Sequence, residues 1–329
     1  MEWLLLPFSL AYRTGSWLRN IPFEAGWRKP HRAALPVISV GNISFGGSEK
    51  TSLVMYLISL CLSRGHNPAL ITRGYKGEWE KKGGILSDGR KILGTWQEGG
   101  DEPFMVALNF PKAGVYVGRN RKISSERAAR DGFDVAILDD GFQVRVLKKD
   151  LDILLYSPKD RVLLREFRGA IRRADCVLVR EEEEEKARED VKRYAPSGRV
   201  FPYRVSLAGF SRLKDDRAVS KQDLFGKRII LVSGIARPER VRLLMEKEGL
   251  APAGFLTFPD HHGYPASSLK RISEEAQKTG AQAVLTTEKD AIKLQGLEDE
   301  SNIPVFYSKI RLVPDQGFDE EIVSVLDAR

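Results

Sequence analysis

Residues Pro36 to Ser52 read PVISVGNISFGGSEKTS, and this stretch decides the fold. Its first five residues predict a buried strand, and the apolar run that begins near Ser52 predicts a helix. The glycine-containing loop between them ends in Lys50 and Thr51. In a strand–loop–helix context the helix N-terminus faces an anion, a lysine adds positive charge and a threonine hydroxyl can ligate magnesium. The stretch therefore predicts a nucleotide-phosphate site; the alternative is an ordinary glycine-rich turn.

The loop departs from the motif G-x-x-x-x-G-K-[ST], because Ser44 and Glu49 stand at its two glycine positions. A carboxylate about 5 Å from a phosphate charge costs about 3 kcal/mol at an effective dielectric constant of 20. Glu49 also adds a Cβ where backbone approaches a ligand. We expect its side chain to swing to solvent or to meet a cation such as Arg73.

The composition describes a soluble globular protein. Its 329 residues suffice for two α/β domains or one large one, with 42% hydrophobic and 30% charged residues. The net charge of +8 favours an anionic partner, which could be nucleotide, nucleic acid or a membrane surface. Cys61 and Cys176 lack metal-ligand spacing and indicate small buried residues. No stretch of 18 uncharged apolar residues occurs, so no membrane-spanning segment is expected.

The N-terminal stretch from Met1 to Asn20 mixes aromatic and aliphatic residues with Arg13 and Arg19. Glu2 and the absence of a small-residue cleavage site make it a poor signal peptide. Such a segment could lie in a membrane interface, with aromatic rings at headgroup depth and arginines on lipid phosphates. The alternative is a helix packed on the protein's own core.

Apolar strands alternate with helices along the chain, which predicts a mostly parallel sheet covered on both faces. The expected strands are 36–41, 68–72, 114–118, 134–139, 151–156 and 175–179, and the expected helices are 51–64, 102–109, 121–131 and 181–194. A second set comprises strands 228–233, 254–258, 283–287 and 304–308 and helices 238–248 and 266–279. The polar stretch from Pro202 to Asp223 reads as an irregular linker between the two sets.

Asp139 and Asp140 close the apolar run that precedes them and fit a magnesium-binding pair. Many strands end in aspartate, so the pair alone is weak. Asp101 opens a helix in GDEP, where it could cap the helix or accept a proton from a substrate hydroxyl. In Asp260-His261-His262, one histidine suits an acid–base role better than a shared metal site; the alternative is a polar loop.

Several motifs together resemble one family. They are VGNISFGGSEKT, TRGYKG (72–77), GDEP (100–103), LDDGFQ (138–143), LRE (164–166) with RRAD (172–175), SGIARPE (233–239), FPDHHGY (258–264) and TTEKDAIKL (286–294). In this order they resemble tetraacyldisaccharide 4'-kinase, the lipid A kinase of Gram-negative bacteria, over nearly the whole chain.

The resemblance implies an ATP-dependent kinase that phosphorylates the 4'-hydroxyl of an acylated glucosamine disaccharide 1-phosphate, giving lipid IVA at the cytoplasmic face of the inner membrane. It implies a P-loop NTPase-like α/β domain plus a smaller αβ domain, joined by a two-stranded linker that lets them close. The implied divisions are an interfacial membrane helix at 1–20, a kinase domain at 21–200, a linker at 201–219, the smaller domain at 220–303 and a returning strand and helix at 304–329.

The resemblance also implies roles for individual residues, with ATP and Mg²⁺ as cofactors. Asp101, oriented by His261, activates the hydroxyl, and Lys50 neutralises the transferred phosphate. The implied nucleotide-binding residues are Asn42, Gly46, Gly47, Ser48, Lys50, Thr51 and Ser52. The implied metal ligands are Thr51, Asp139, Asp140 and Glu166. Tyr75, Arg121 and Arg165 would line the cleft, and Arg119 could replace Arg121.

Three positions depart from the family pattern: Glu49 replaces glycine, Val144 replaces histidine and Phe167 replaces proline. They leave open a catalytically impaired homologue that binds nucleotide or lipid A precursor without turnover. A nucleic-acid-binding ATPase would use the positive charge, but the basic residues are scattered and form no recognisable motif. The kinase interpretation is the one that accounts for Asp101, Asp139, Asp140 and His261.

Overall fold

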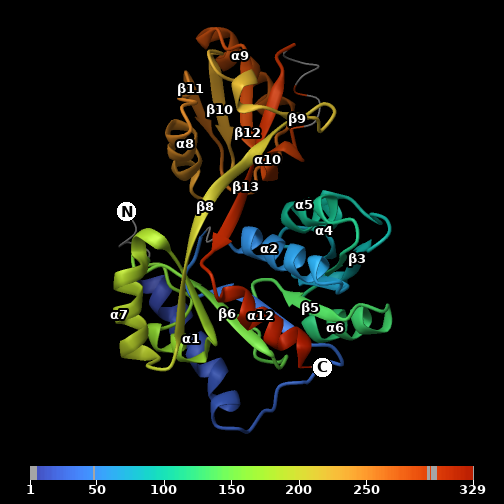
Figure 1. Ribbon diagram of the computed structural model, residues 1–329, viewed down its shortest axis with the longest axis vertical. Helices are drawn as coiled ribbons and strands as arrows, with labels where there is room; N and C mark the ends of the chain where they lie inside the picture. The colour runs from blue at the N-terminus through green and yellow to red at the C-terminus, as the bar shows by residue number, and fades with distance from the viewer. Residues whose placement is uncertain (1–5, 47–48, 295–296, 298–301, 329) are drawn as a thin grey trace. The chain divides into compact units, whose positions relative to one another are not determined.

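The computed structural model describes residues 6–46, 49–294, 297 and 302–328. It divides into two compact units: Met1–Arg204 with Leu312–Arg329, and Val205–Arg311. The chain passes between them within two strands, β8 (Arg199–Arg212) and β13 (Val305–Pro314). Figure 1 shows both strands by label and colour.

The first unit alternates strands and helices. Its strands are β1 (Val37–Asn42), β2 (Pro68–Thr72), β3 (Gly84–Asp88), β4 (Gly114–Val117), β5 (Val135–Leu138), β6 (Leu151–Tyr156), β7 (Cys176–Arg180) and the first part of β8. Its α-helices are α1 (Leu6–Glu24), α2 (Lys50–Ser63), α3 (Trp79–Lys82), α4 (Trp96–Gly99), α5 (Asp101–Asn109), α6 (Arg121–Arg130), α7 (Glu184–Tyr194) and α12 (Phe318–Asp327). Short 3₁₀ helices are η2 (Arg168–Arg173) and η3 (Glu181–Glu183).

The sheet of the first unit runs in the order β8-β7-β6-β1-β5-β2-β4-β3. Neighbours from β8 to β4 are parallel, and β3 pairs antiparallel with β4. β1 is central and fully buried, as expected for a strand covered on both faces. Its carboxyl end lies beside that of β5, because Ser39 pairs with Leu138. The expected mostly parallel α/β fold is therefore observed.

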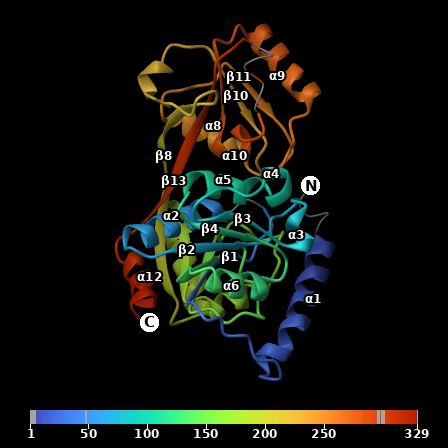
Figure 2. The same ribbon diagram turned by 90° about the vertical axis from the view of Figure 1, so that its right-hand side faces the viewer.

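Two apolar cores cover the sheet of the first unit. One joins Phe142 and β6–β7 to Ala187 and Val191 of α7. The other joins β1, β2 and β5 to Ala128 of α6. Helices α1 and α12 lie at opposite sides of this unit in Figure 2.

The second unit has a smaller sheet in the order β11-β10-β12-β13, with β8 next to β13 and β9 paired antiparallel to β8. Its further elements are β9 (Ala218–Val219), β10 (Ile229–Ser233), β11 (Gly254–Thr257), β12 (Ala283–Thr287), α8 (Pro238–Lys247), α9 (Ala266–Thr279), α10 (Glu288–Ala291) and η4 (Lys221–Asp223). Two apolar cores, one including Ile272 of α9 and the other Met245 of α8, flank this sheet.

The expectation of an irregular stretch from Pro202 to Asp223 is wrong. Its first half, Pro202 to Arg212, belongs to strand β8, which pairs with β7 at Tyr203 and with β9 at Phe210. The polar composition misled because β8 has few fully buried positions, and most of its pairing partners are distant in sequence. Strand β3 was also missed, and the expected helix 181–194 begins with the 3₁₀ turn η3.

Candidate active site

The strand edge at the carboxyl ends of β1, β2 and β5 collects the residues of the expected phosphate site. β1 ends at Asn42 and α2 begins at Lys50. Gly46 between them has φ of 103°, a conformation that glycine adopts freely. Gly47 and Ser48 lie outside the described residues, and Ser52 stands half-buried in the first turn of α2.

Lys50 lies between two oxygen atoms of this edge. Its Nζ donates to Oδ1 of Asn42 at 3.3 Å and lies 3.4 Å from Oδ1 of Asp140. The lysine charge is therefore held at the mouth of the loop by groups from β1 and from the residues after β5.

The negative charge of Asp140 is balanced by more nearby positive charge than that of Asp139. Arg165 donates to both of its oxygens at 2.9 and 2.8 Å. Burial would raise the pKa of Asp140, but Lys50 and Arg165 outweigh burial and lower it to about 2. Arg165 reaches it because Ser44 of the loop after β1 pairs with the neighbouring Leu164.

Asp139 is the less compensated aspartate. Its Oδ2 accepts a hydrogen bond from Thr72 at 2.9 Å, while its buried Oδ1 has no hydrogen-bond partner in the described part of the chain. Burial raises the pKa of Asp139 to about 6, and the charges of Glu102 and Asp140 act in the same direction. A buried carboxylate with an unpaired oxygen is ready to accept a cation.

The start of α5 brings two more carboxylates to the edge. Thr51 donates to Oε2 of Glu102 at 2.5 Å. The neighbouring Asp101 is only 6% exposed and accepts the backbone N–H of Glu102 at 2.9 Å. Gly100, which precedes α5, has φ of 96°. The hydrogen bond between Thr51 and Glu102 joins the first turn of α2 to the first turn of α5.

We call Lys50, Thr51, Glu102, Asp139 and Asp140 the strand-edge cluster. Carboxylate and hydroxyl oxygens are the ligands that Mg²⁺ takes in proteins. The unpaired Oδ1 of Asp139 and the neighbouring carboxylates of Glu102 and Asp140, which raise its pKa, fit a divalent cation. The residues present thus suit the expected metal.

The three expected cleft residues occupy different surroundings. Arg165 belongs beside Asp140, as described. Arg121 is 5% exposed and donates to the carbonyl oxygen of Gly118. Burial lowers the pKa of Arg121 to about 10, and its Nε has no partner among the residues described. Tyr75 is 53% exposed, with Nζ of Lys76 5.8 Å from its ring centre.

Arg119, the alternative to Arg121, is a surface residue. It donates to Oε1 of Glu80 at 2.7 Å, and Arg73 lies 2.8 Å from the same oxygen. Arg121 is the buried member of the pair, and its charge interacts with Asp139 and Asp140.

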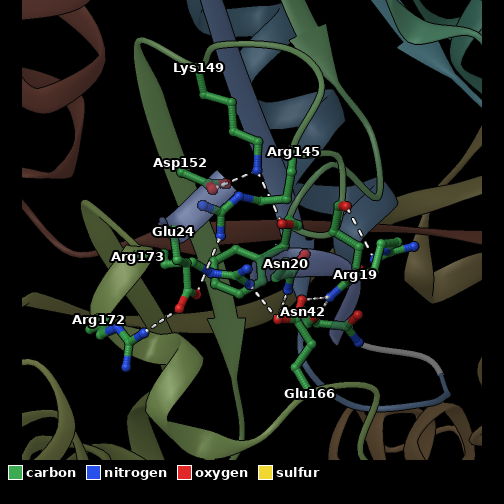
Figure 3. A network of polar contacts seen from close by, with 12 residues as sticks. Arg19, Asn20, Glu24, Asn42, Arg145, Lys149, Asp152, Glu166, Arg172 and Arg173 are labelled. Carbon is green, nitrogen blue, oxygen red and sulfur yellow. Dashed lines mark hydrogen bonds and ion pairs between the residues drawn. The ribbon is translucent and has the colours of Figure 1, made fainter. Parts of the chain in front are cut away.

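Glu166 belongs to a network of polar contacts that reaches Asn42 at the end of β1 (Figure 3). Its Oε2 accepts from Asn20 at 3.2 Å and from Arg173 at 2.7 Å, and its Oε1 accepts from Gln143 at 3.1 Å. Gln143 also donates to the carbonyl of Asn42 at 2.8 Å. We call Asn20, Gln143, Glu166 and Arg173 the α1 network. The structure brings Glu166 to α1, and its role as a metal ligand stays a prediction.

His261 belongs to the second unit, in the loop after β11. Its backbone is left-handed, with φ of 60°. Its Nε2 lies 3.4 Å from Nζ of Lys289 and 3.7 Å from Oδ2 of Asp260. Because Asp101 belongs to the first unit, the pairing of the two side chains stays a prediction.

The three departures have structural explanations. Glu49 meets Arg180, with 2.6 Å between Oε1 and Nη2, and not Arg73 as suggested above; Arg73 is held by Glu80. Val144 packs against an apolar core of the sheet. Phe167 has the guanidinium of Arg13 5.4 Å from its ring centre.

Sequence reasoning did not assign roles to Glu102, Thr72 or Arg180. Glu102 and Thr72 lie inside the motifs GDEP and TRGYKG, so their position beside assigned residues was an available signal. Arg180 ends a strand far from the loop in sequence, and no local pattern indicates its partner.

Comparison with known proteins assigns the chain to a family. The family model for tetraacyldisaccharide-1-P 4'-kinase matches residues 1–327. A tetraacyldisaccharide 4'-kinase of Desulfotalea psychrophila is 35% identical, with 96% of this chain and 94% of the relative covered. That of Syntrophus aciditrophicus is 35% identical, with 98% and 92% covered.

The fold agrees with a solved structure of LpxK from Aquifex aeolicus in complex with ATP. The TM-score is 0.77 at 30% identity, and 99% of each chain is covered. The chain therefore belongs to the tetraacyldisaccharide-1-P 4'-kinase family and is a lipid kinase.

Proposed function

We propose that the protein transfers the γ-phosphate of ATP to the 4'-hydroxyl of tetraacyldisaccharide 1-phosphate. The observation that carries this proposal is the strand-edge cluster, in which Lys50 and Thr51 share one edge with Asp139 and Asp140. The names of the relatives support the lipid substrate, and the ATP in the Aquifex aeolicus structure supports the nucleotide.

The proposed roles follow from charge. Lys50 neutralises transferred phosphate, and Asp101 accepts the proton of the attacking hydroxyl. Oxygens of Thr51, Asp139 and Asp140 would hold Mg²⁺, which when bound neutralises phosphate charge. Asn42 orients Lys50 through the 3.3 Å hydrogen bond. Phosphoryl transfer needs little more than such positioning and electrostatic stabilisation.

We also propose that His261 orients Asp101 during catalysis and that the strands near 201–219 and 304–314 act as a linker permitting closure. The family resemblance motivates both statements. Closure would exclude water from the reacting groups. A His261→Ala variant that retains the parent kcat would overturn the role of the histidine.

We propose further that α1 lies on the cytoplasmic face of a bacterial inner membrane. Its polar residues Ser9, Ser16 and Asn20 are buried, whereas Phe8 is 74% and Trp17 52% exposed. An exposed aromatic face on a helix whose polar side is buried suits a lipid interface. Among the residues described, no helix is long and apolar enough to cross a membrane.

Flotation with anionic vesicles tests the membrane proposal. Phe8→Ser/Trp17→Ser should no longer float with the vesicles, whereas Leu243→Ser, which changes an exposed residue of α8, should float like the parent. Unchanged flotation of the double variant contradicts the assignment of α1.

The decisive test of the kinase is phosphate transfer from Mg-ATP to tetraacyldisaccharide 1-phosphate in detergent micelles. We expect transfer by the parent and a loss of at least about a hundredfold in Asp101→Ala. Folded protein that binds the nucleotide without transferring phosphate would instead favour the catalytically impaired homologue.

A further inference from the structure

Glu49 occupies an unusual position at the start of α2. It is the residue before Lys50, and its backbone is left-handed, with φ of 54° and ψ of 19°. That conformation favours glycine, so the residue type is not explained by the backbone. Its side chain is only 13% exposed and so is not turned out to solvent.

Two side chains hold this carboxylate. Arg180 donates to Oε1 at 2.6 Å, and the hydroxyl of Tyr203 donates to Oε2 at 3.2 Å. Arg180 ends β7 and pairs directly with Tyr203 of β8. Two paired residues on neighbouring parallel strands thus donate hydrogen bonds to the two carboxylate oxygens of Glu49.

These two contacts to Glu49 are important because the residue lies at the N-terminus of α2, directly before Lys50. A helix N-terminus beside a lysine attracts phosphate, and an uncompensated carboxylate at the same place repels it. The positive charge of Arg180, which also lies 3.4 Å from the more exposed Glu182, offsets the negative charge of Glu49. Arg73, the other candidate cation, lies 2.8 Å from Glu80.

We propose that Arg180 is a positioning residue for nucleotide binding: it holds the carboxylate of Glu49 against β7 and β8 and so permits a glutamate where the motif carries glycine. Tyr203 is its second anchor. The inference rests on the proposed function, because it assumes that the loop after β1 binds the phosphates of ATP.

The test is a double-mutant cycle on Mg-ATP affinity, measured by isothermal titration calorimetry on the full chain in detergent. Arg180→Ala should weaken binding by about tenfold or more, because the carboxylate of Glu49 then loses the positive charge of Arg180. Glu49→Gln should stay within about threefold of the parent. The double variant should bind like Glu49→Gln, because removing the carboxylate removes the need for Arg180.

A matched control is Arg168→Ala. Arg168 forms a half-buried pair with Asp190 at 3.2 Å in the same unit, and its loss should leave Mg-ATP affinity unchanged. Thermal unfolding of every variant separates effects on folding from effects on binding.

A double variant as weak as Arg180→Ala would overturn the inference, since Arg180 would then act on the nucleotide or the fold independently of Glu49. Unchanged affinity in Arg180→Ala would overturn it as well. A folded parent that binds no Mg-ATP would overturn the nucleotide function itself, and that outcome is distinct because it precedes any mutation.

Discussion

The strand-edge cluster and the α1 network lie in the same unit, but they differ in how completely their buried carboxylates are hydrogen-bonded. In the strand-edge cluster, Asp139 keeps an oxygen without a partner among the described residues, and its pKa is raised to about 6. In the α1 network, both oxygens of Glu166 accept hydrogen bonds, one of them from Arg173 at 2.7 Å.

The difference contrasts a buried carboxylate that has an oxygen available for a cation with one whose two oxygens both have protein partners. Burying a carboxylate without full compensation costs stability, and the cost is recovered when a cation binds. A fully paired carboxylate needs no ligand, but it becomes costly when one partner is removed. Each cluster can therefore be tested by measuring stability and activity in the same variant.

The largest effect should come from Asp139→Asn. We expect phosphate transfer to fall by at least about a hundredfold, because a contact to the proposed cation is lost. Its free energy of unfolding at neutral pH, without divalent metal, should rise, because the buried charge is gone. Transfer assays measure the first effect and urea unfolding the second. The control is Glu126→Gln, a change at a partly exposed residue of α6 that pairs with Lys122 and His31. An Asp139→Asn variant that keeps its activity and is less stable than the parent would contradict the proposed difference between the two clusters.

Arg173→Met should show the reverse behaviour. It leaves Glu166 buried without its cation, so we expect a loss of about 3–5 kcal/mol in the free energy of unfolding. Transfer per folded molecule should change much less. The double variant Arg173→Met/Glu166→Met should recover part of the loss, because no charge is then left unpaired. Urea unfolding checks this, and a loss below about 1 kcal/mol in the single variant would contradict it.

The pH dependence of stability should sharpen the contrast. The folded-state pKa of Asp139 is raised from its ordinary value of 3.8 to about 6. The native state therefore binds more protons than the unfolded state between these values, and this contribution to stability falls as pH rises through the window. About two pKa units correspond to about 3 kcal/mol.

The measurement is urea unfolding of the metal-free protein between pH 4 and pH 7, with Asp139→Asn as the reference. The difference in stability between the variant and the parent should grow in favour of the variant as pH rises. An identical pH profile for both proteins would show that Asp139 titrates normally.

The smallest effect should come from Arg172→Ala. Arg172 lies beside Arg173 in sequence, but its pair with Glu24 at 3.0 Å is exposed to solvent. We expect a loss below about 1 kcal/mol, because solvent screens such pairs. Urea unfolding compared with Arg173→Met measures how much burial contributes; equal losses would contradict the argument.

Much of the strand-edge cluster could be predicted from local sequence. Lys50 and Thr51 follow one strand, and Asp139 and Asp140 follow its parallel neighbour, so pairing of the two strands brings all four residues to the same edge of the sheet. The contact of Thr51 with Glu102 could not be predicted, because it depends on how two helices approach each other.

The stretch after Pro202 shows where reasoning from local sequence failed. The polar stretch after Pro202 predicted irregular structure, and the chain forms β8 there. β8 forms a strand because it pairs with β7 and β9, and the composition of a stretch does not show which strands it will pair with. The boundaries of the two units likewise follow from how the strands associate.

The sequence by itself determined the alternating α/β order, the loop that ends in Lys50 and Thr51, and the family to which the motifs belong. These depend on apolar periodicity and on residues that are adjacent along the chain. Only the tertiary structure decided that Arg180 pairs with Glu49 and that Asn20 of α1 donates to Glu166. The interaction between two charges depends on their distance in space, which the tertiary structure sets. Burial determines how much stability is lost when a charge has no partner.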